Sequence, residues 1–269
     1  MNSTLPAPSE IKDFYDRKLR EIGGEYIQYR WGSSEIQRRH FRQTYGALSA
    51  VLATHQLRGQ VLEIGAGPAV WTELYIDGIE KLTLLDISAE MLNAAKNRID
   101  SWNGGTYADR VTYVCGDANQ SALPPASFDA IVTIRAFEYF SDKVLFLQQC
   151  QRMLKMDGLL ILGTKNAEWE DSIQERGQSF GSSAARSQVE AAMQTDLVSP
   201  LQLVSMAEQA GLRHLYSRPL VFGSYRRRYR LPGSLWYFDM LHRRHATHSI
   251  KRALSRLVES FVLVAQKLG

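Results

Sequence analysis

Long apolar runs are absent from this chain, and cysteine is scarce. No stretch approaches 18 consecutive apolar residues, and the first ten, MNSTLPAPSE, lack a basic-then-apolar signal layout. We therefore expect a soluble cytoplasmic protein. Its two cysteines, Cys115 and Cys150, are not spaced as C-x-x-C, which argues against a zinc site or a disulfide framework. Both fall in apolar runs, so we expect them to be buried.

The composition is that of a globular protein with one unevenly charged end. Hydrophobic residues make up 45% of the 269 and charged residues 22%, so wholesale disorder is excluded. From Arg226 onward there are ten lysines and arginines but two acids, a net charge of +8, whereas the whole chain carries +4. The basic character therefore describes one local surface.

One stretch, VLEIGAGPAVW at residues 61–71, predicts a buried parallel strand that ends in a tight turn and leads into a helix. Gly65 and Gly67 can adopt backbone angles closed to other residues and let a ligand approach the main chain. A dinucleotide fingerprint requires glycine or alanine where this chain has Val70. Here the small residue comes earlier, at Ala69, and Glu63 suits a cationic or hydroxyl-bearing ligand better than a pyrophosphate.

The resulting pattern, E-x-G-x-G-x-A, resembles the first motif of the class I S-adenosylmethionine-dependent methyltransferases, in a small-molecule branch similar to the enzymes of quinone biosynthesis. Asp86 ends the next predicted strand, KLTLLD, 19 residues after Gly67, where nucleotide-binding units place an acid that binds ribose hydroxyls. Ser88 is the expected cap of the following helix, 89–102. The strand at 111–118 ends in Gly-Asp-Ala, which resembles the family's third cofactor segment. There Asp117 and the amide of Ala118 are expected to meet the adenine.

The phrase LPPASFDAIVTIRAFEYF resembles the family's segment leading into the active-site loop, with its strand at 128–134. Further strands are expected at 154–162 and 212–223, and helices at 71–77, 141–154 and 199–210. Strands that alternate with helices predict an α/β fold, and the resemblance makes it Rossmann-like. We expect a mostly parallel seven-stranded sheet with helices on both faces. Met156 and Asp157 replace a proline and a glycine common in the family's turn.

We divide the chain into an N-terminal helical cap at 1–59, a methyltransferase core at 60–223, a basic helical insertion at 224–260 and a final core strand at 261–269. Residues 2–9 read as a frayed tail. The polar stretch 165–198 reads as a flap. Within the cap, Tyr29 to Gly32 is expected to face the ligand, because a Gly/Ser break there puts aromatic and basic groups near a loop.

The insertion allows three interpretations. It is a helical hairpin with a solvated basic face, a surface for anionic lipid or a phosphate-bearing substrate through 224–256, or an RNA-binding segment. The lipid interpretation would make the protein peripheral to a membrane. His242, His245 and His248 recur at a spacing of three, but no cysteines or acids accompany them, so we expect no metal site.

The resemblance implies S-adenosylmethionine as cofactor and methyl transfer by in-line displacement to a small or amphiphilic acceptor. Positioning is the main catalytic device such a reaction needs. Candidate bases are Glu138, Tyr139 and His40. The expected cofactor contacts are Glu63, Gly65, Ala66, Gly67, Asp86, Ile87, Asp117, Ala118, Arg135 and Tyr29. The alternatives are a nucleotide-dependent oxidoreductase and a non-catalytic RNA- or membrane-binding module. The acceptor and the oligomeric state are left open.

Overall fold

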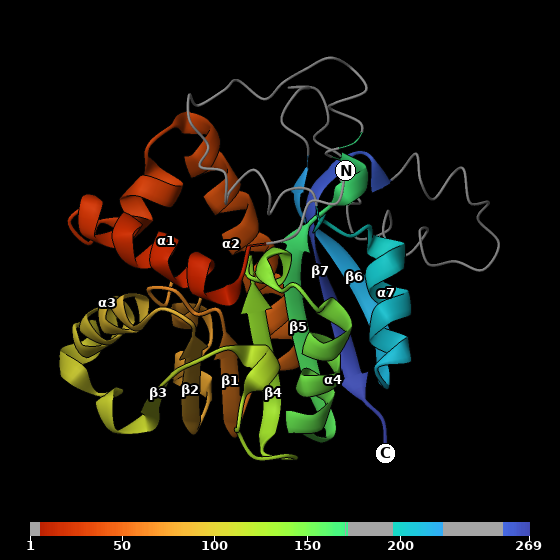
Figure 1. Ribbon diagram of the computed structural model, residues 1–269. Coiled ribbons are helices and arrows are strands. Elements are labelled where there is room, and N and C mark those ends of the chain that lie inside the picture. Colours follow the sequence, from red (N-terminus) through yellow and green to blue (C-terminus); the bar gives the residue numbers. More distant parts are fainter. Residues whose placement is uncertain (1–5, 170, 172–195, 223–254) are drawn as a thin grey trace.

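The computed structural model describes residues 6–169, 171, 196–222 and 255–269. A seven-stranded sheet in the order β3-β2-β1-β4-β5-β7-β6 forms its centre (Figure 1). Strands β1 to β5 run parallel to one another, and β7 pairs antiparallel with both β5 and β6. The strands are β1 Gln60–Ile64, β2 Lys81–Asp86, β3 Val111–Cys115, β4 Phe128–Ile134, β5 Leu154–Lys165, β6 Leu212–Phe222 and β7 Val258–Lys267.

Helices begin where a side chain can cap their free amides. Ser34, Ser88 and Ser199 each accept a hydrogen bond from the amide three residues on, and Ser199 forms a capping box with Gln202. The α-helices are α1 Pro8–Glu21, α2 Glu35–His55, α3 Ala89–Asp100, α4 Lys143–Met153 and α7 Pro200–Gln209. One π-helical turn, η1 Gln28–Gly32, lies between α1 and α2. The 3-10 turns are η2 Thr72–Leu74, η3 Ile76–Gly78, η4 Trp102–Gly105, η5 Ala108–Arg110, η6 Ala118–Gln120 and η7 Phe137–Tyr139.

Apolar side chains fill both faces of the sheet. On one face Val51 of α2 and Ile99 of α3 pack in one cluster with Val61 of β1. On the other face Phe146 of α4 and Leu203 of α7 share a cluster with Leu62 and Ile64. Alternate residues of β1 thus face opposite layers, as the pleat of a strand requires. The predicted mostly parallel seven-stranded α/β fold is confirmed, with helices before the first strand.

Several local expectations need correction. The helix expected at 71–77 is the pair of 3-10 turns η2 and η3. Asp142, and not Ser141, caps α4, because its Oδ1 accepts from the amide of Leu145 at 2.8 Å. Residues 8 and 9 belong to α1, where Pro8 occupies the first helical position. Cys150 is buried as expected, but Cys115 is exposed because β3 is an edge strand.

The final strand begins three residues before its predicted start. Val258 already pairs with Phe222 of β6, and Ser260 pairs with Lys165 of β5. Glu259 and Ser260 were predicted to end the basic helical insertion, but both residues belong to β7. The bulk of the predicted insertion, with its three histidines, and most of the predicted flap lie outside the described residues. Among the helices that are described, none is long and apolar enough to cross a membrane.

Candidate functional site

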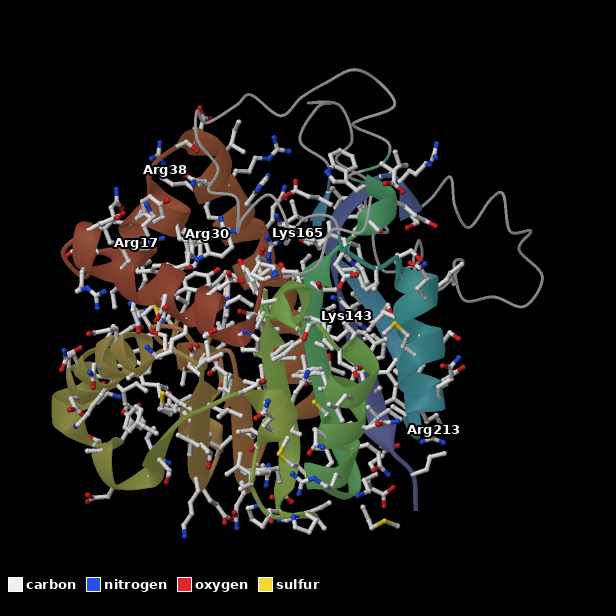
Figure 2. All side chains as sticks on the ribbon, in the orientation of Figure 1. Arg17, Arg30, Arg38, Lys143, Lys165 and Arg213 are labelled. Atoms are coloured by element: carbon white, nitrogen blue, oxygen red, sulfur yellow. The ribbon has the colours of Figure 1, made fainter. Side chains whose placement is uncertain are left out.

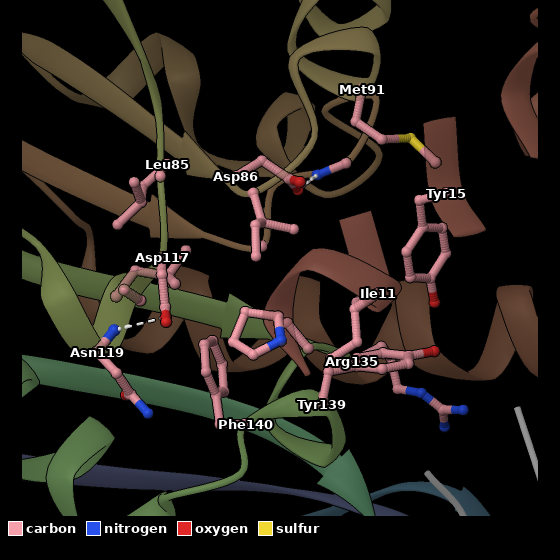
Figure 3. Close-up of a pocket in the computed structure, with 18 of the residues that line it drawn as sticks. Ile11, Tyr15, Leu85, Asp86, Met91, Asp117, Asn119, Arg135, Tyr139 and Phe140 are labelled. Carbon is pink, nitrogen blue, oxygen red and sulfur yellow. Dashed lines mark hydrogen bonds between the residues drawn. The ribbon is translucent and has the colours of Figure 1, made fainter. Parts of the chain in front are cut away.

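A pocket opens at the carboxyl ends of β1, β2, β3 and β4, the edge at which open α/β sheets bind ligands (Figure 3). Its cavity measures about 130 Å³. One water molecule needs about 10–15 Å³ on the same measure, so there is room for part of an organic ligand. Eight of the predicted site residues line it: Gly65, Gly67, Asp86, Ile87, Asp117, Ala118, Arg135 and Tyr139.

The glycine turn after β1 forms the floor of this pocket. Gly65 and Gly67 have φ angles of +66° and +52°, which glycine adopts without strain. The Gly65 amide donates to the carbonyl of Leu85 at 2.8 Å, which ties the turn to β2. A Cβ on Gly65 would lie 2.3 Å from the Cβ of Ala136, whereas one on Gly67 would meet no atom within 4 Å. Gly65 therefore allows a close approach inside the protein, and Gly67 leaves space on the ligand side.

Two carboxylates flank the turn on the same side of the sheet. Asp86 accepts from the amide of Gly67 at 2.8 Å and from that of Ser88 at 2.9 Å. Burial raises the pKa of Asp86, and those two amides counter part of this rise. Asp117 accepts from the amide of Asn119 at 2.9 Å through Oδ1 (Figure 3), and Oδ2 has no hydrogen-bond partner among the described residues. Both carboxylates keep acceptor capacity for a ligand.

Helix α1 and the segment after it cover the pocket. Pro8, Ile11, Tyr15 and Tyr26 belong to its lining. The ring centroid of Tyr15 lies 5.6 Å from that of Tyr139 in an edge-on contact. Burial raises the pKa of Tyr15 and of Tyr139, so both phenols keep their protons at neutral pH. This wall is aromatic and apolar.

Arg135 closes the end of β4 in an unusual backbone conformation. Its φ is +63°, rare for a side chain with a Cβ, and its amide donates to the carbonyl of Gly163 at 2.7 Å. Its Nε lies 3.3 Å from Oε1 of Glu138, and Oε2 of Glu138 accepts from Thr164 at 3.0 Å. Glu138 is buried. Its carboxylate therefore stabilises Arg135 in place.

Glu63 lies away from the pocket. It is buried on the face of β1 opposite Ile64, where it accepts hydrogen bonds from the hydroxyls of Thr72 and Tyr75. Burial raises its pKa to about 7, although both hydroxyls lower it. Successive residues within a strand face opposite layers, so the Glu63 side chain points to the layer opposite that of Ile64. Glu63 holds the segment after the glycine turn.

Four more predicted residues are not in the pocket lining. Ala66 is buried in the glycine turn, where its carbonyl accepts from Ala69. Tyr29 is exposed, and the Nζ of Lys18 lies 5.1 Å from its ring centroid. Glu138 lies behind Arg135. Nε2 of His40 lies 3.3 Å from Oε2 of Glu259 on β7. Tyr26, which precedes the π-helical turn, lines the pocket in place of Tyr29.

Part of the lining was not among the predicted contacts. Tyr15 and Tyr26 stand out in the sequence as aromatic residues of the N-terminal helices, but no local spacing distinguishes a ligand-facing tyrosine from a core tyrosine, so neither was assigned to the ligand. Proline followed by serine and glutamate at residues 8–10 is a helix-start signal, which could have placed the start of α1 at Pro8 but not its position over the pocket. The other unlisted lining residues are Ile64, Leu85, Met91, Gly116, Asn119, Ala136, Phe140 and Ser141.

Comparison with known proteins defines the class. Residues 62–162 match a family model described as a methyltransferase domain. Together with the sheet order and a pocket over the glycine turn, the match shows that the chain carries a class I methyltransferase domain, the class that uses S-adenosylmethionine.

Individual relatives share parts of this chain. It is 29% identical over 108 residues to the ubiquinone biosynthesis O-methyltransferase of Actinobacillus pleuropneumoniae serotype 7. That alignment covers 40% of this chain and 46% of the relative. It is 25% identical over 170 residues to the 27-O-demethylrifamycin SV methyltransferase of Amycolatopsis mediterranei, 60% of either chain. The chain thus spans about half the length of the curated relatives it matches.

A solved structure extends the likeness to almost the whole fold. The magnesium protoporphyrin IX methyltransferase of Synechocystis, solved with bound S-adenosylhomocysteine, has a TM-score of 0.62 at 14% identity. That alignment covers 97% of this chain and 100% of the other. At this identity the likeness concerns the fold alone, so the chemistry of this chain depends on its own pocket.

Proposed function

We propose that this chain transfers a methyl group from S-adenosylmethionine to an oxygen, nitrogen or carbon atom of a small or amphiphilic molecule. The observation that carries the proposal is the meeting of Gly67, Asp86 and Asp117 around one cavity. When bound, S-adenosylmethionine supplies a methyl group on a positively charged sulfur. That charge suits a pocket whose lining includes two carboxylates and three tyrosine rings.

The residues fit an adenosyl ligand in their chemistry. Asp86 has acceptor capacity for two ribose hydroxyls, since each carboxylate oxygen can accept a hydrogen bond beyond the amides it holds. Oδ2 of Asp117 and the amide of Ala118 offer the acceptor and donor that an adenine edge requires. Ile87 and Met91 supply apolar surface for the ring.

The chain contributes position and shelter more than proton transfer. Holding two reactants in line can supply roughly 7–11 kcal/mol of a barrier, which suits a site with α1 across its mouth. Tyr139 lines the pocket and keeps its proton, so we assign it to hydrogen bonding or packing. Glu138 is held by Arg135 and Thr164, and we assign it to positioning Arg135.

A methyl-transfer assay tests the proposal directly. The protein is incubated with tritium-labelled S-adenosylmethionine and fractionated cell extract, and label is expected in a small or amphiphilic product. Asp86→Ala should lose most of the transfer, while the exposed control Asp109→Ala should keep it. Calorimetry with S-adenosylhomocysteine checks the cofactor step by itself. Absence of binding at about 100 micromolar, some hundredfold above an ordinary micromolar affinity, would contradict the proposal.

Binding measurements combined with the transfer assay separate the two alternative functions. Tight binding of NADH without binding of S-adenosylhomocysteine would favour the oxidoreductase. Binding of RNA or anionic vesicles that falls steeply with salt, without transfer to any acceptor, would favour the non-catalytic module. We also retain, as part of the proposal, the division into a helical cap, a core and a basic segment at 224–260 whose last residues belong to β7.

A further inference from the structure

Basic side chains from four elements gather beside the pocket. We call Arg30 of η1, Arg39 of α2, Arg135 after β4 and Lys165 at the end of β5 the basic cluster. Figure 2 shows Arg30 and Lys165 above the carboxyl ends of the central strands, between the N-terminal helices and the sheet. The cluster adjoins the pocket through Arg135 and through Tyr26, one turn before Arg30.

Strand pairing holds two members of the cluster, Arg135 and Lys165, next to one another. Arg135 donates its amide to Gly163 on β5 at 2.7 Å, two residues before Lys165. At Lys165, β5 pairs with β7, and Glu259 of β7 lies 3.3 Å from Nε2 of His40 on α2. The tips of β4, β5 and β7 therefore present the cluster along one edge.

The potential at this edge is positive. Burial, followed by the four members of the basic cluster, lowers the pKa of His40 to about 4, although the Glu259 carboxylate is adjacent. Protonation of His40 is therefore unfavourable even though the Glu259 carboxylate lies next to it. Like charges gathered in a partly buried space cost free energy unless anions compensate them, and Glu138 already compensates Arg135.

Arg30 has the clearest need for such an anion. Its guanidinium packs 4.5 Å over the ring of Trp31, and among the described residues no carboxylate lies within 4 Å of it. Burial lowers the pKa of Arg30, while the nearby Tyr26, Tyr139 and Tyr15 and, after them, the Glu138 carboxylate raise it. Glu138 already contacts Arg135 and Thr164. A guanidinium matches the geometry of carboxylate and phosphate oxygens. Arg30 also belongs to a π-helical turn, a rare form that recurs at functional sites.

We propose that the methyl acceptor carries an oxyanion, a carboxylate or a phosphate monoester, which the basic cluster holds through Arg30. This inference rests on the proposed function and adds the acceptor's chemical class. The anchored group fixes the acceptor on the side of Arg30 and Lys165, so that the rest of the molecule reaches the pocket at Arg135 and Tyr139. A carboxylate could also come from the cofactor itself, and the experiment separates these two sources.

The test uses the full chain saturated with S-adenosylhomocysteine. Calorimetry then compares 2-naphthoate and 2-naphthyl phosphate with the uncharged 2-naphthamide. We expect at least one of the two anions to bind about tenfold to hundredfold more tightly than the amide, the range for a charged hydrogen-bonded contact. Arg30→Gln should remove that preference. Arg17→Gln removes the same charge from the exposed face of α1 and should keep it.

Each other outcome has a defined meaning. Equal affinity for both anions and the amide would overturn the inference. Anion binding only in the absence of S-adenosylhomocysteine, with Arg30→Gln weakening S-adenosylhomocysteine but not 5′-methylthioadenosine, would assign Arg30 to the cofactor's carboxylate and also overturn it. If S-adenosylhomocysteine itself does not bind the wild-type chain, the proposed function fails, which is a separate result.

Discussion

At the scale of single residues, Glu63 is an acid enclosed where water cannot solvate its charge. Only 1% of its surface is exposed, and its partners are the hydroxyls of Thr72 and Tyr75. The protonated form is favoured by burial, and the two hydroxyls partly favour the ionised form. The stability of the segment that Glu63 holds therefore depends on pH.

We predict that Glu63→Gln removes one contribution to the pH dependence of stability, a fall in the free energy of unfolding with rising pH. The native pKa of Glu63 is about 7 and its ordinary value is 4.5, so the native state retains a proton that the unfolded state releases between these values. The free energy of unfolding should therefore fall as pH rises from 4.5 to 7, by an amount on the order of 3 kcal/mol from this group. Urea unfolding at pH 5, 6, 7 and 8 measures it.

The control for this series is Glu80→Gln, an exposed substitution of the same kind. It should keep the wild-type slope. His40 has its pKa lowered to about 4 and contributes the opposite slope between pH 4 and 6.5, but it is present in every variant and cancels in the difference. A slope in Glu63→Gln identical to that of wild type would mean that Glu63 is ionised in the native state.

Residues also show how far the sequence alone reaches. Gly65, Gly67, Asp86 and Asp117 could be placed at the pocket because motif spacing and strand ends determine where they lie. Glu63 could not be placed, because the strand's own sequence does not tell which of its two faces is turned toward the cavity. The roles of all these residues toward a ligand stay predictions.

At the scale of elements, α1 is held to the core by a specific contact. Asp16 accepts hydrogen bonds from Ser88 at the start of α3 and from Nζ of Lys12, the latter at 2.6 Å. Ser88 in turn accepts from the amide of Met91 as the cap of α3. The same helix supplies Ile11 and Tyr15 to the pocket. The pocket is therefore complete only when α1 is docked on the core.

We predict that Asp16→Ala weakens binding of S-adenosylhomocysteine by up to about tenfold. Loss of a hydrogen bond to a charged group costs about 1.5–3 kcal/mol, and the part that keeps α1 docked is transmitted to the ligand. Calorimetry measures the affinity, and hydrogen exchange should show faster opening of α1. Asp13→Ala, whose side chain is 76% exposed on the same helix, should change neither. Faster exchange with unchanged affinity would show that α1 does not complete the site.

Elements with strong local signals were predictable, and those set by tertiary contacts were not. Ser88 was predicted as a cap and a helix was predicted to begin at Ser199, because serine at a helix start can accept a hydrogen bond from a free amide. The turns η2 and η3 replace a predicted helix because Thr72 and Tyr75 turn inward to Glu63. The docking of α1 depends on Asp16 meeting a residue 72 positions away, which no local pattern encodes.

At the scale of the whole molecule, the sheet joins distant parts of the chain. Strand β7 lies between β5 and β6, so residues 258–267 connect the parallel core to the β6 edge. Seven of its side chains have no exposed surface: Val258, Ser260, Phe261, Val262, Leu263, Val264 and Ala265. The predicted strand count followed from the family resemblance, but the position of β7 inside the sheet is set by pairing on both sides.

We predict that Phe261→Ala destabilises the whole described fold and not one edge of it. Phe261 pairs with Thr164 on β5 and with Pro219 on β6, and truncating such a fully buried ring costs about 3–5 kcal/mol. Tryptophan fluorescence and far-ultraviolet circular dichroism should give coincident urea transitions, both moved to lower urea. Leu268→Ala, at a side chain 48% exposed, should stay within about 0.5 kcal/mol of wild type. Separate transitions in Phe261→Ala would mean that the β6 edge unfolds independently of the strands that hold the pocket.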